Sequence, residues 1–278
     1  MPDELRRVKT VRLSSSRAEA GEDLAAAEEP LEVRLDGKPF SVIMRTPGAD
    51  RELAAGFLFA ERVVTSADDL ARIEPARAKA LLVGRPPPNI VNVRLAAERA
   101  ARLDEILAGR RQVTTNSSCG LCGRVTIASL KVEAPAVRAV WQISPDFVVA
   151  LPGRLGTCQR VFHKTGGLHA AGLFHRNGDL VELAEDVGRH NAVDKVVGRL
   201  LLAKQLPAGD HVLLVSGRAS FEIVQKAFLA GVPVVAAVSA PSTLAIDLAN
   251  EVGVTLLGFV RGERFNIYSH PHRIACSP

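Results

Sequence analysis

Two cysteines stand two residues apart in a short polar segment, and their spacing suits covalent sulfur or metal chemistry. Cys119 and Cys122 lie within Thr114–Gly123 (TTNSSCGLCG), where small residues and glycine predict a loop. The thiolate is the nucleophilic form of cysteine, and the nearby Arg110, Arg111 and Arg124 favour it by stabilising negative charge. The segment is therefore the first candidate for a reactive site.

Three kinds of site use such a pair of thiols. A structural zinc site needs about four ligands, so further donors would have to come from Cys158, His163 and His169 or from a second subunit. A thioredoxin-like site places its pair at a helix start after a strand, a context that this loop lacks. A sulfur carrier holds a persulfide on one cysteine while the second thiol assists release, and a polar, exposed loop suits it. We interpret Cys158 as a small buried side chain and Cys276 as a tail thiol.

Two further segments place basic and hydroxyl side chains where a strand ends or a helix begins. They are Glu185–Lys195 (EDVGRHNAVDK) and Ser216–Lys226 (SGRASFEIVQK). Their candidate ligand-binding residues are Arg189, His190, Ser216 and Arg218. A helix N-terminus beside arginine favours phosphate, although the same charges could form a solvated capping network.

A third segment of this kind, Gly258–Tyr268 (GFVRGERFNIY), places two arginines around a glycine past a strand end. Arg261 and Arg264 could together bind a pyrophosphate. The chain has neither the GxxxxGK[ST] spacing of a P-loop nor a GxGxxG. The three turns together predict an anionic, nucleotide-like ligand. By contrast, Gly166–Phe174 (GGLHAAGLF) read alone predicts a tight turn and a hydrogen-bonded histidine.

Composition limits the class of protein. The 278 residues are 47% hydrophobic and 23% charged, which predicts a soluble folded protein. The longest apolar stretch, Gly231–Ala240, is too short to span a bilayer, and the N-terminus lacks a signal-peptide core, so we expect a cytoplasmic protein without a membrane span. The net charge of +5 favours anionic ligands, but only 4% of residues are aromatic, which argues against nucleic-acid binding.

The pattern along the chain predicts a mobile arm over residues 1–28 and an α+β domain over 29–113. The cysteine loop follows at 114–124, and an α/β domain occupies 125–278, where strands and helices alternate. The strands expected there are His169–Phe174, His211–Ser216, Val232–Val238 and Val254–Val260. The helices expected between them are Asn191–Leu202, Phe221–Ala230 and Ser242–Glu251. This alternation predicts a largely parallel sheet between helix layers, with ligands at the strand ends.

Six segments together resemble the FdhD family of formate dehydrogenase accessory sulfurtransferases. The matching segments are SSCGLCG, TGGLHAAGLF, EDVGRHNAVDK, SGRASFEIVQKA, VSAPSTLAIDLA and GFVRGERFNIYSHP, which extend from the cysteine loop almost to the C-terminus. The resemblance implies that Cys119 accepts sulfur from a cysteine desulfurase as a persulfide, with Cys122 assisting. The sulfur would pass to a molybdenum bis(molybdopterin guanine dinucleotide) cofactor destined for formate dehydrogenase.

The resemblance also implies a fold and a cofactor-binding segment. The fold would be a cytidine-deaminase-like three-layer α/β/α domain preceded by a smaller α+β domain, in a homodimer that binds guanine nucleotides such as GDP. The cofactor-binding segment would be Val260, Arg261, Gly262, Glu263, Arg264 and Phe265. Because no resident metal is implied, we expect none.

Other functions remain as alternatives. A zinc nucleobase deaminase uses H-x-E and P-C-x-x-C, but His169 is followed by two alanines and Ser118 precedes Cys119, so deaminase chemistry is not expected. The loop could instead be a zinc-stapled contact, or the chain a nucleotide-binding maturation chaperone for formate dehydrogenase without sulfur transfer. A nucleotide-dependent regulator would bind GDP without forming a persulfide.

Overall fold

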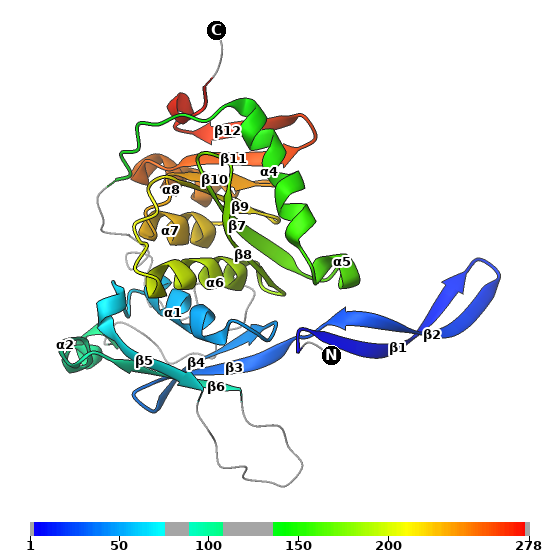
Figure 1. The fold of residues 1–278 in the computed structure, drawn as a ribbon, viewed down its shortest axis with the longest axis horizontal. Helices are drawn as coiled ribbons and strands as arrows, with labels where there is room; N and C mark the ends of the chain where they lie inside the picture. The colour runs from blue at the N-terminus through cyan, green and yellow to red at the C-terminus, as the bar shows by residue number, and fades with distance from the viewer. Residues whose placement is uncertain (1–2, 76–88, 108–135, 276–278) are drawn as a thin grey trace.

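The computed structural model describes residues 3–75, 89–107 and 136–275 (Figure 1). Both catalytic candidates, Cys119 and Cys122, lie outside these residues, as do Arg124 and Cys276. The described residues form a long hairpin, a four-stranded sheet and a six-stranded sheet.

The chain begins with an antiparallel hairpin instead of the arm without regular structure that we expected over residues 1–28. Its strands are β1 (Leu5–Ser14) and β2 (Arg17–Ala26). Opposite charges stabilise it across the strands, since Arg7 lies 3.2 Å from the carboxylate of Glu22. The sequence did not predict these two strands, because their many charged residues obscure the alternation of apolar and polar side chains.

The four-stranded sheet forms the smaller α+β part of the molecule. Its strands are β3 (Glu29–Leu35), β4 (Lys38–Arg45), β5 (Leu70–Pro75) and β6 (Ile90–Leu95), in the spatial order β4-β3-β6-β5. Its helices are α1 (Asp50–Ala60), α2 (Ala97–Ala101) and α3 (Leu103–Leu107), with a 3-10 turn at Ala67–Asp69. Asp36-Gly37 is a dipeptide typical of a tight hairpin turn, and it makes the turn between β3 and β4 with φ of 48° and 84°. Helices α2 and α3 are both short and meet at Arg102.

The six-stranded sheet has the order β12-β11-β10-β9-β7-β8. Its strands are β7 (His169–His175), β8 (Leu180–Asp186), β9 (His211–Val215), β10 (Val234–Ala237), β11 (Thr255–Arg261) and β12 (Arg264–Ser269). Its helices are α4 (Pro145–Cys158), α5 (Phe162–Thr165), α6 (Arg189–Leu202), α7 (Phe221–Leu229) and α8 (Thr243–Val252), followed by a 3-10 turn at Pro271–Arg273. The expected alternation of strands and helices is confirmed from β9 to β11.

The expectation of a largely parallel sheet is wrong. Only β9, β10 and β11 run parallel to one another, whereas β7, β8 and β12 each pair antiparallel with their neighbours. Tight turns cause this, because Gly178 and Gly262 take φ of 104° and 61° and reverse the chain after β7 and β11. The sequence prediction missed β8 and β12, which are the two partly exposed edge strands.

Helices cover both faces of the six-stranded sheet, so this part of the molecule has three layers (Figure 1). Strand residues alternate between the faces: Val212 and Leu214 pack with α4, whereas Leu213 and Val215 pack in the core that includes α6, α7 and α8. The mixed α/β class is therefore observed, with α6 facing the smaller part of the molecule.

Helices α1 and α6 join the two sheets through a close backbone contact. A Cβ on Gly56 of α1 would lie 1.9 Å from the carbonyl oxygen of Asp194, and one on Gly198 of α6 would lie 1.9 Å from that of Glu52. The hydrophobic core is continuous across this contact, from β3 to β10. The predicted boundaries near residues 113 and 124 lie outside the described residues, so the domain division stays a prediction.

We expect Gly56→Ala to lower the free energy of unfolding by about 3 kcal/mol or more, because the new methyl group meets backbone atoms that cannot turn away. The matched control is Gly153→Ala in α4, where a Cβ meets nothing within 4 Å and alanine should stabilise the helix by up to about 1 kcal/mol. Urea denaturation measures both changes. Equal stability of the two variants would contradict the close contact.

Candidate functional site

One edge of the six-stranded sheet gathers all the turns that the sequence singled out. The parallel strands β9, β10 and β11 end there, and the antiparallel neighbours place His169, Asp186 and Arg264 at the same edge. In register, His169 lies opposite Asp186, and Arg261 lies opposite Arg264. We call this the site edge. The three turns that the sequence singled out therefore lie at one edge where strands end, and their binding of a ligand stays a prediction.

Three helices begin at the site edge, directly after strand ends. Their N-cap residues are Gly188 for α6, Ser220 for α7 and Ser242 for α8. The first turn of a helix has backbone N–H groups without helical partners and carries partial positive charge. Three such ends along one sheet edge favour a ligand with several negative oxygens.

Three basic side chains meet at the site edge between β7 and β9. The pKa of His169 is lowered, first by burial and then by the charge of Arg189, with a smaller effect of Arg218 and an opposing one of Asp186. A Cβ on Gly217 would lie 3.3 Å from the His169 Nδ1 atom and 3.9 Å from the Arg189 Cδ atom, so only glycine leaves this space open. The Arg189 Nε atom is buried and has no hydrogen-bond partner among the described residues.

The structure changes the interpretation of two residues, His169 and Ser216. His169 read alone predicts a hydrogen-bonded histidine in a turn, and only the pairing of β7 with β8 and β9 reveals that it lies among the arginines. The Ser216 hydroxyl oxygen accepts a hydrogen bond of 2.8 Å from the backbone N–H of Ala170. Ser216 therefore holds β9 against β7 as well as lying near the candidate ligand site.

His190 lies beneath the site edge as a neutral side chain. It is buried, its Nε2 atom is 3.0 Å from the Ser220 Oγ atom, and the Glu222 carboxylate is 3.7 Å away. Burial, together with the charges of Lys226 and Arg189, lowers the pKa of His190 to about 3. His190 therefore adds no charge near neutral pH, and its contact fixes the hydroxyl group at the start of α7.

A buried ion pair connects the site edge to the four-stranded sheet. The Asp186 carboxylate lies 2.7 Å from Lys195 Nζ, and neither side chain is appreciably exposed. Asp186 also accepts from the backbone N–H of Gly188 at 2.8 Å, which fixes the start of α6. Lys195 donates to the carbonyl oxygen of Thr46 at 2.9 Å, and Asn191 donates to that of Met44 at 2.8 Å. The segment that carries Arg189 is thus held from both sides.

A second buried pair lies deeper in the core. Lys226 Nζ of α7 is 2.5 Å from the Asp194 carboxylate of α6. Burial raises the pKa of Asp194 to about 6 even though Lys226 favours its ionised form. The pair holds α6 against α7, so two of the three helix N-termini at the site edge are fixed relative to each other.

The expected cofactor-binding segment forms the turn between β11 and β12. Arg261, Glu263 and Arg264 are exposed there, and Gly262 makes the turn with positive φ. The Val260 side chain is buried in the core, so only its backbone could contact a ligand.

Two members of the segment, Phe265 and Arg261, pack against neighbouring side chains. Phe265 is partly buried against the α4 side of the sheet, and the Arg261 guanidinium lies 5.3 Å from the ring centre of Phe259. The turn between β11 and β12 is two strands away from the end of β9, or about 10 Å along the site edge. Arg261 and Arg264 therefore extend the basic surface of that edge.

Of the four cysteines, the structure describes Cys158. Cys119 and Cys122 lie in the undescribed range, so their role stays a prediction. Cys158 at the end of α4 is exposed, which corrects the interpretation that it is buried. Within the described ranges, no three His, Cys, Asp or Glu side chains lie close enough to hold a metal ion. No helix in those ranges is long and apolar enough to cross a membrane.

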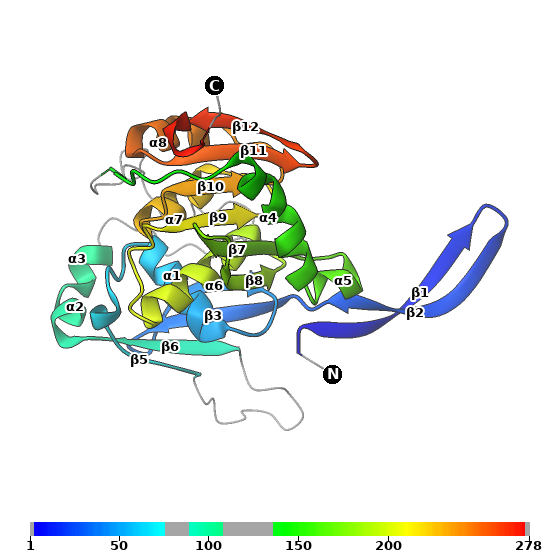
Figure 2. The ribbon, with the colours of Figure 1, turned by 45° about the horizontal axis from the view of Figure 1, so that its top comes forward.

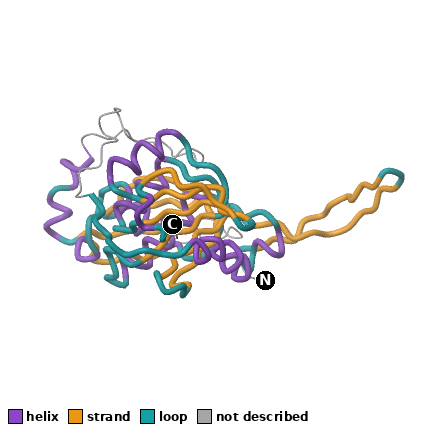
Figure 3. The backbone as a smooth tube through the Cα atoms, turned by 90° about the horizontal axis from the view of Figure 1, so that it is seen from above, coloured by secondary structure: helices purple, strands orange, loops and turns teal. Residues whose placement is uncertain are grey.

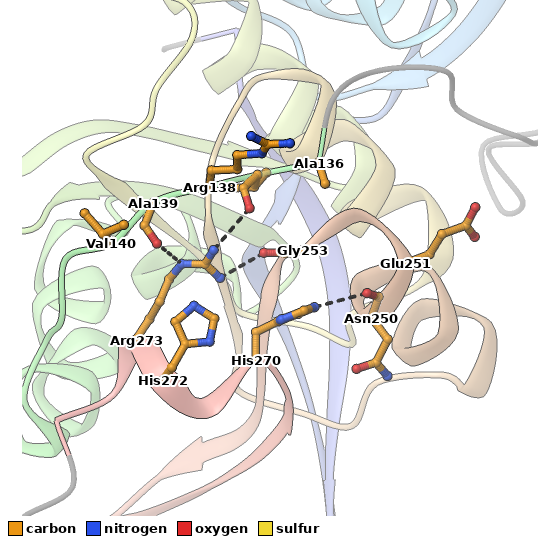
Figure 4. A pocket seen from close by; sticks show the side chains of 11 residues that line it. Ala136, Arg138, Ala139, Val140, Asn250, Glu251, Gly253, His270, His272 and Arg273 are labelled. Carbon is orange, nitrogen blue, oxygen red and sulfur yellow. Dashed lines mark hydrogen bonds between the residues drawn. The ribbon is translucent and has the colours of Figure 1, made fainter.

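A depression of about 410 Å³ lies at the opposite edge of the sheet, where α8 ends and β11 begins (Figure 4). Its buried Arg273 donates to the carbonyl oxygens of Ala139 and Gly253 at 3.0 and 2.8 Å. The His270 ring contacts the carbonyl oxygen of Asn250 at 3.1 Å. These groups hold the connection into α4 against the end of α8, so their contacts are structural.

Comparison with known proteins gives a consistent result. A model of the FdhD/NarQ family matches residues 26–275. The sulfur carrier protein FdhD of Streptomyces avermitilis is 50% identical over 276 residues, covering 97% of this chain and 95% of that protein. The protein of the same name from Sulfurisphaera tokodaii is 42% identical over 274 residues, with coverage of 98% and 99%.

The fold is also similar to that of a solved structure. A crystal structure described as that of a formate dehydrogenase accessory protein from Desulfotalea psychrophila superposes with a TM-score of 0.75 and covers 97% of this chain and 99% of that one. The two sequences are 24% identical, so the likeness supports the fold alone.

The buried neutral His190 predicts a defined pH dependence of stability. Its folded pKa of about 3 lies below its ordinary value of 6.5, so the unfolded chain binds a proton that the folded chain cannot. Stability therefore falls as the pH drops from 6.5 towards 3. Relative to His190→Gln, the wild type should lose about 1.4 kcal/mol between pH 7.5 and pH 5.5 in urea denaturation. Parallel pH profiles of the two proteins would contradict a neutral buried His190.

Proposed function

This chain belongs to the FdhD/NarQ family, and we propose that it is a sulfur carrier protein, a sulfurtransferase that serves the maturation of formate dehydrogenase. Relatives 42% and 50% identical over nearly the whole chain carry the name sulfur carrier protein FdhD, which supports the sulfur-carrying role. The segment with Cys119 and Cys122 is the part of the sequence suited to hold that sulfur.

In the proposed reaction, Cys119 takes over one sulfur atom from a persulfide on a cysteine desulfurase. Its thiolate attacks the terminal sulfur, a new S–S bond forms, and the desulfurase cysteine leaves as a thiolate. Cys119 then carries the persulfide. Cys122 assists its later release, since a second thiol two residues away can reach the same sulfur.

The proposed acceptor is the molybdenum of a bis(molybdopterin guanine dinucleotide) cofactor, which is the substrate. One observation carries this part of the proposal: a single sheet edge brings together three helix N-termini and the basic side chains of His169, Arg189 and Arg218. A dinucleotide presents a pyrophosphate, which such an edge suits. The exposed Arg261 and Arg264 would bind the remaining phosphate or guanine groups, for which GDP is the simplest probe.

The resemblance supports further proposals about the fold and the partners. The three-layer part would have a cytidine-deaminase-like fold, and the protein would work as a cytoplasmic homodimer with a desulfurase and the catalytic subunit of formate dehydrogenase as partners. The opening left by Gly217 beside His169 and Arg189 fits a bound anion at the centre of the site edge.

Mass spectrometry after incubation with a cysteine desulfurase and L-cysteine tests the carrier role. We expect the wild type to gain the mass of one sulfur atom at Cys119 and Cys119→Ser to lose at least nine-tenths of that loading, because the acceptor thiolate is gone. Cys158→Ser is the matched control: it removes an exposed thiol outside the CxxC segment and should load like the wild type. Equal loading of Cys119→Ser would contradict the proposal, and stoichiometric zinc lost in Cys122→Ser would favour the zinc-stapled alternative.

A further inference from the structure

The two ends of β7 are the parts of that strand that solvent reaches. Its five central residues are buried, whereas His169 at its start and His175 at its end are partly exposed. Figure 3 shows the strands of the body running between helices on either side. In Figure 2, as in Figure 1, α5 leads into β7 on the same side of the sheet as the turn between β11 and β12. His169 therefore lies at the site edge and His175 at the opposite edge.

Gly217 leaves the Nδ1 atom of His169 uncovered on one side. A Cβ at this position would lie 3.3 Å from Nδ1 and 3.9 Å from Arg189 Cδ, so any side chain there would shield the ring from a ligand. The Arg189 Nε atom, which is bonded to that Cδ, is buried and has no hydrogen-bond partner among the described residues. Buried donors are nearly always paired. The absent side chain and the unpartnered donor together point to a ligand oxygen that both basic groups contact.

Backbone contacts fix the positions of His169 and Gly217 relative to each other. The N–H of Ser216, which precedes Gly217, donates to the carbonyl oxygen of Ala170 at 2.9 Å. The N–H of Ala170, which follows His169, donates to the Ser216 Oγ atom at 2.8 Å. The carbonyl oxygen of Gly217 accepts from the N–H of Ser239 at 3.3 Å. The contact surface for a ligand is therefore formed before the ligand binds.

Charged groups face His169 from α6, from β8 and from the turn after β9. Burial lowers the pKa of His169 below its ordinary value of 6.5, and the charges of Arg189 and Arg218 act in the same direction, whereas Asp186 opposes them. His190 of α6 adds no charge, because its pKa is about 3. In the free protein the His169 ring is therefore mostly uncharged near neutral pH.

We propose that His169 is a ligand-binding residue that gains its charge together with the ligand: when a pyrophosphate group binds beside Gly217, the ring takes up one proton from the solvent and donates it to a phosphate oxygen. An anion within about 4–6 Å favours the protonated imidazole, and it also offsets the charges of Arg189 and Arg218. An uncharged ligand would not recover this proton, so His169 selects for the pyrophosphate. The proposal rests on the site edge as the cofactor site of the proposed function.

Proton uptake makes the affinity depend on pH in a definite direction. Between the pKa of His169 in the free protein and its higher pKa in the complex, the complex holds more protons than the free protein, so affinity rises as the pH falls. GDP is not a clean probe of this effect, because a terminal phosphate itself titrates near a pKa of about 6. Diguanosine pyrophosphate has the same kind of pyrophosphate, esterified at both ends, and so lacks that titrating group.

Isothermal titration with diguanosine pyrophosphate tests the proposal. We expect the wild type to take up roughly half a proton per ligand at pH 6.5, measured in buffers of different ionisation enthalpy. It should bind about threefold or more tightly at pH 6.0 than at pH 8.0. His169→Asn keeps an amide near the place of Nδ1 but cannot take up a proton, so both effects should disappear. His175→Asn, at the other end of the same strand, is the matched control and should behave like the wild type.

The outcomes separate this proposal from the proposed function. Binding by the wild type without proton uptake would overturn the role of His169 and leave the cofactor site in place, and this result does not depend on any variant. Equal pH dependence in His169→Asn would also overturn it. No binding by the wild type would overturn the role of His169 together with the cofactor site, while sulfur loading on Cys119 would still test the carrier role.

A second pair of variants tests the place of contact. Gly217→Ala puts a methyl group 3.3 Å from Nδ1 and should weaken binding about fivefold or more, because the methyl group crowds the ring and the ligand. Gly209→Ala is the matched control: this glycine lies just before β9 at the opposite edge, a Cβ there meets nothing within 4 Å, and the affinity should not change. Equal affinity of the two variants would contradict binding beside Gly217.

Discussion

The buried ion pair between Asp186 and Lys195 fixes the part of the structure on which the site depends. Asp186 ends β8 and accepts from the N–H of Gly188 that starts α6, while Lys195 donates to the carbonyl oxygen of Thr46 near β4. Taking two charges out of water is unfavourable, and the hydrogen bonds around both groups offset that penalty. Removing either partner would leave an uncompensated charge at the junction of the two sheets. The ion pair therefore fixes the start of α6, and with it the position of Arg189 at the site edge.

The residues of the short segment from Asp186 to Lys195 therefore have different roles. Asp186, Asn191 and Lys195 face inward and hold the two sheets together, whereas Arg189 lies beside His169 at the site edge. His190 stays neutral under the edge, so the positive charge there comes from arginines and helix N-termini rather than from histidine. Such charge does not vary near neutral pH. A ligand with several phosphate oxygens would therefore meet the same surface throughout the physiological range.

Local patterns predicted some of this structure and long-range packing determined the rest. The apolar runs of β9 to β11 and the periodicity of α6 to α8 are local, and they were recognised. The edge strands β8 and β12 were missed, because their partly exposed sequences acquire strand geometry by pairing with a neighbour. The inward role of Lys195 was not predictable, since its partner Thr46 lies 149 residues earlier. The hairpin over β1 and β2 was missed because its charges pair across the strands. His169 is recognised as a site residue only in the structure, where the pairing of β7 with β8 places it opposite Asp186.

The central claim is that the site edge binds the anionic groups of the cofactor, and isothermal titration with GDP tests it most directly. Arg189→Gln and Arg218→Gln each remove one positive charge from the site edge, and the account predicts that each weakens GDP binding at least tenfold. Arg176→Gln is the control, because that exposed arginine follows β7 at the opposite edge of the sheet. Undiminished affinity in both site-edge variants, or an equal loss in Arg176→Gln, would contradict the account.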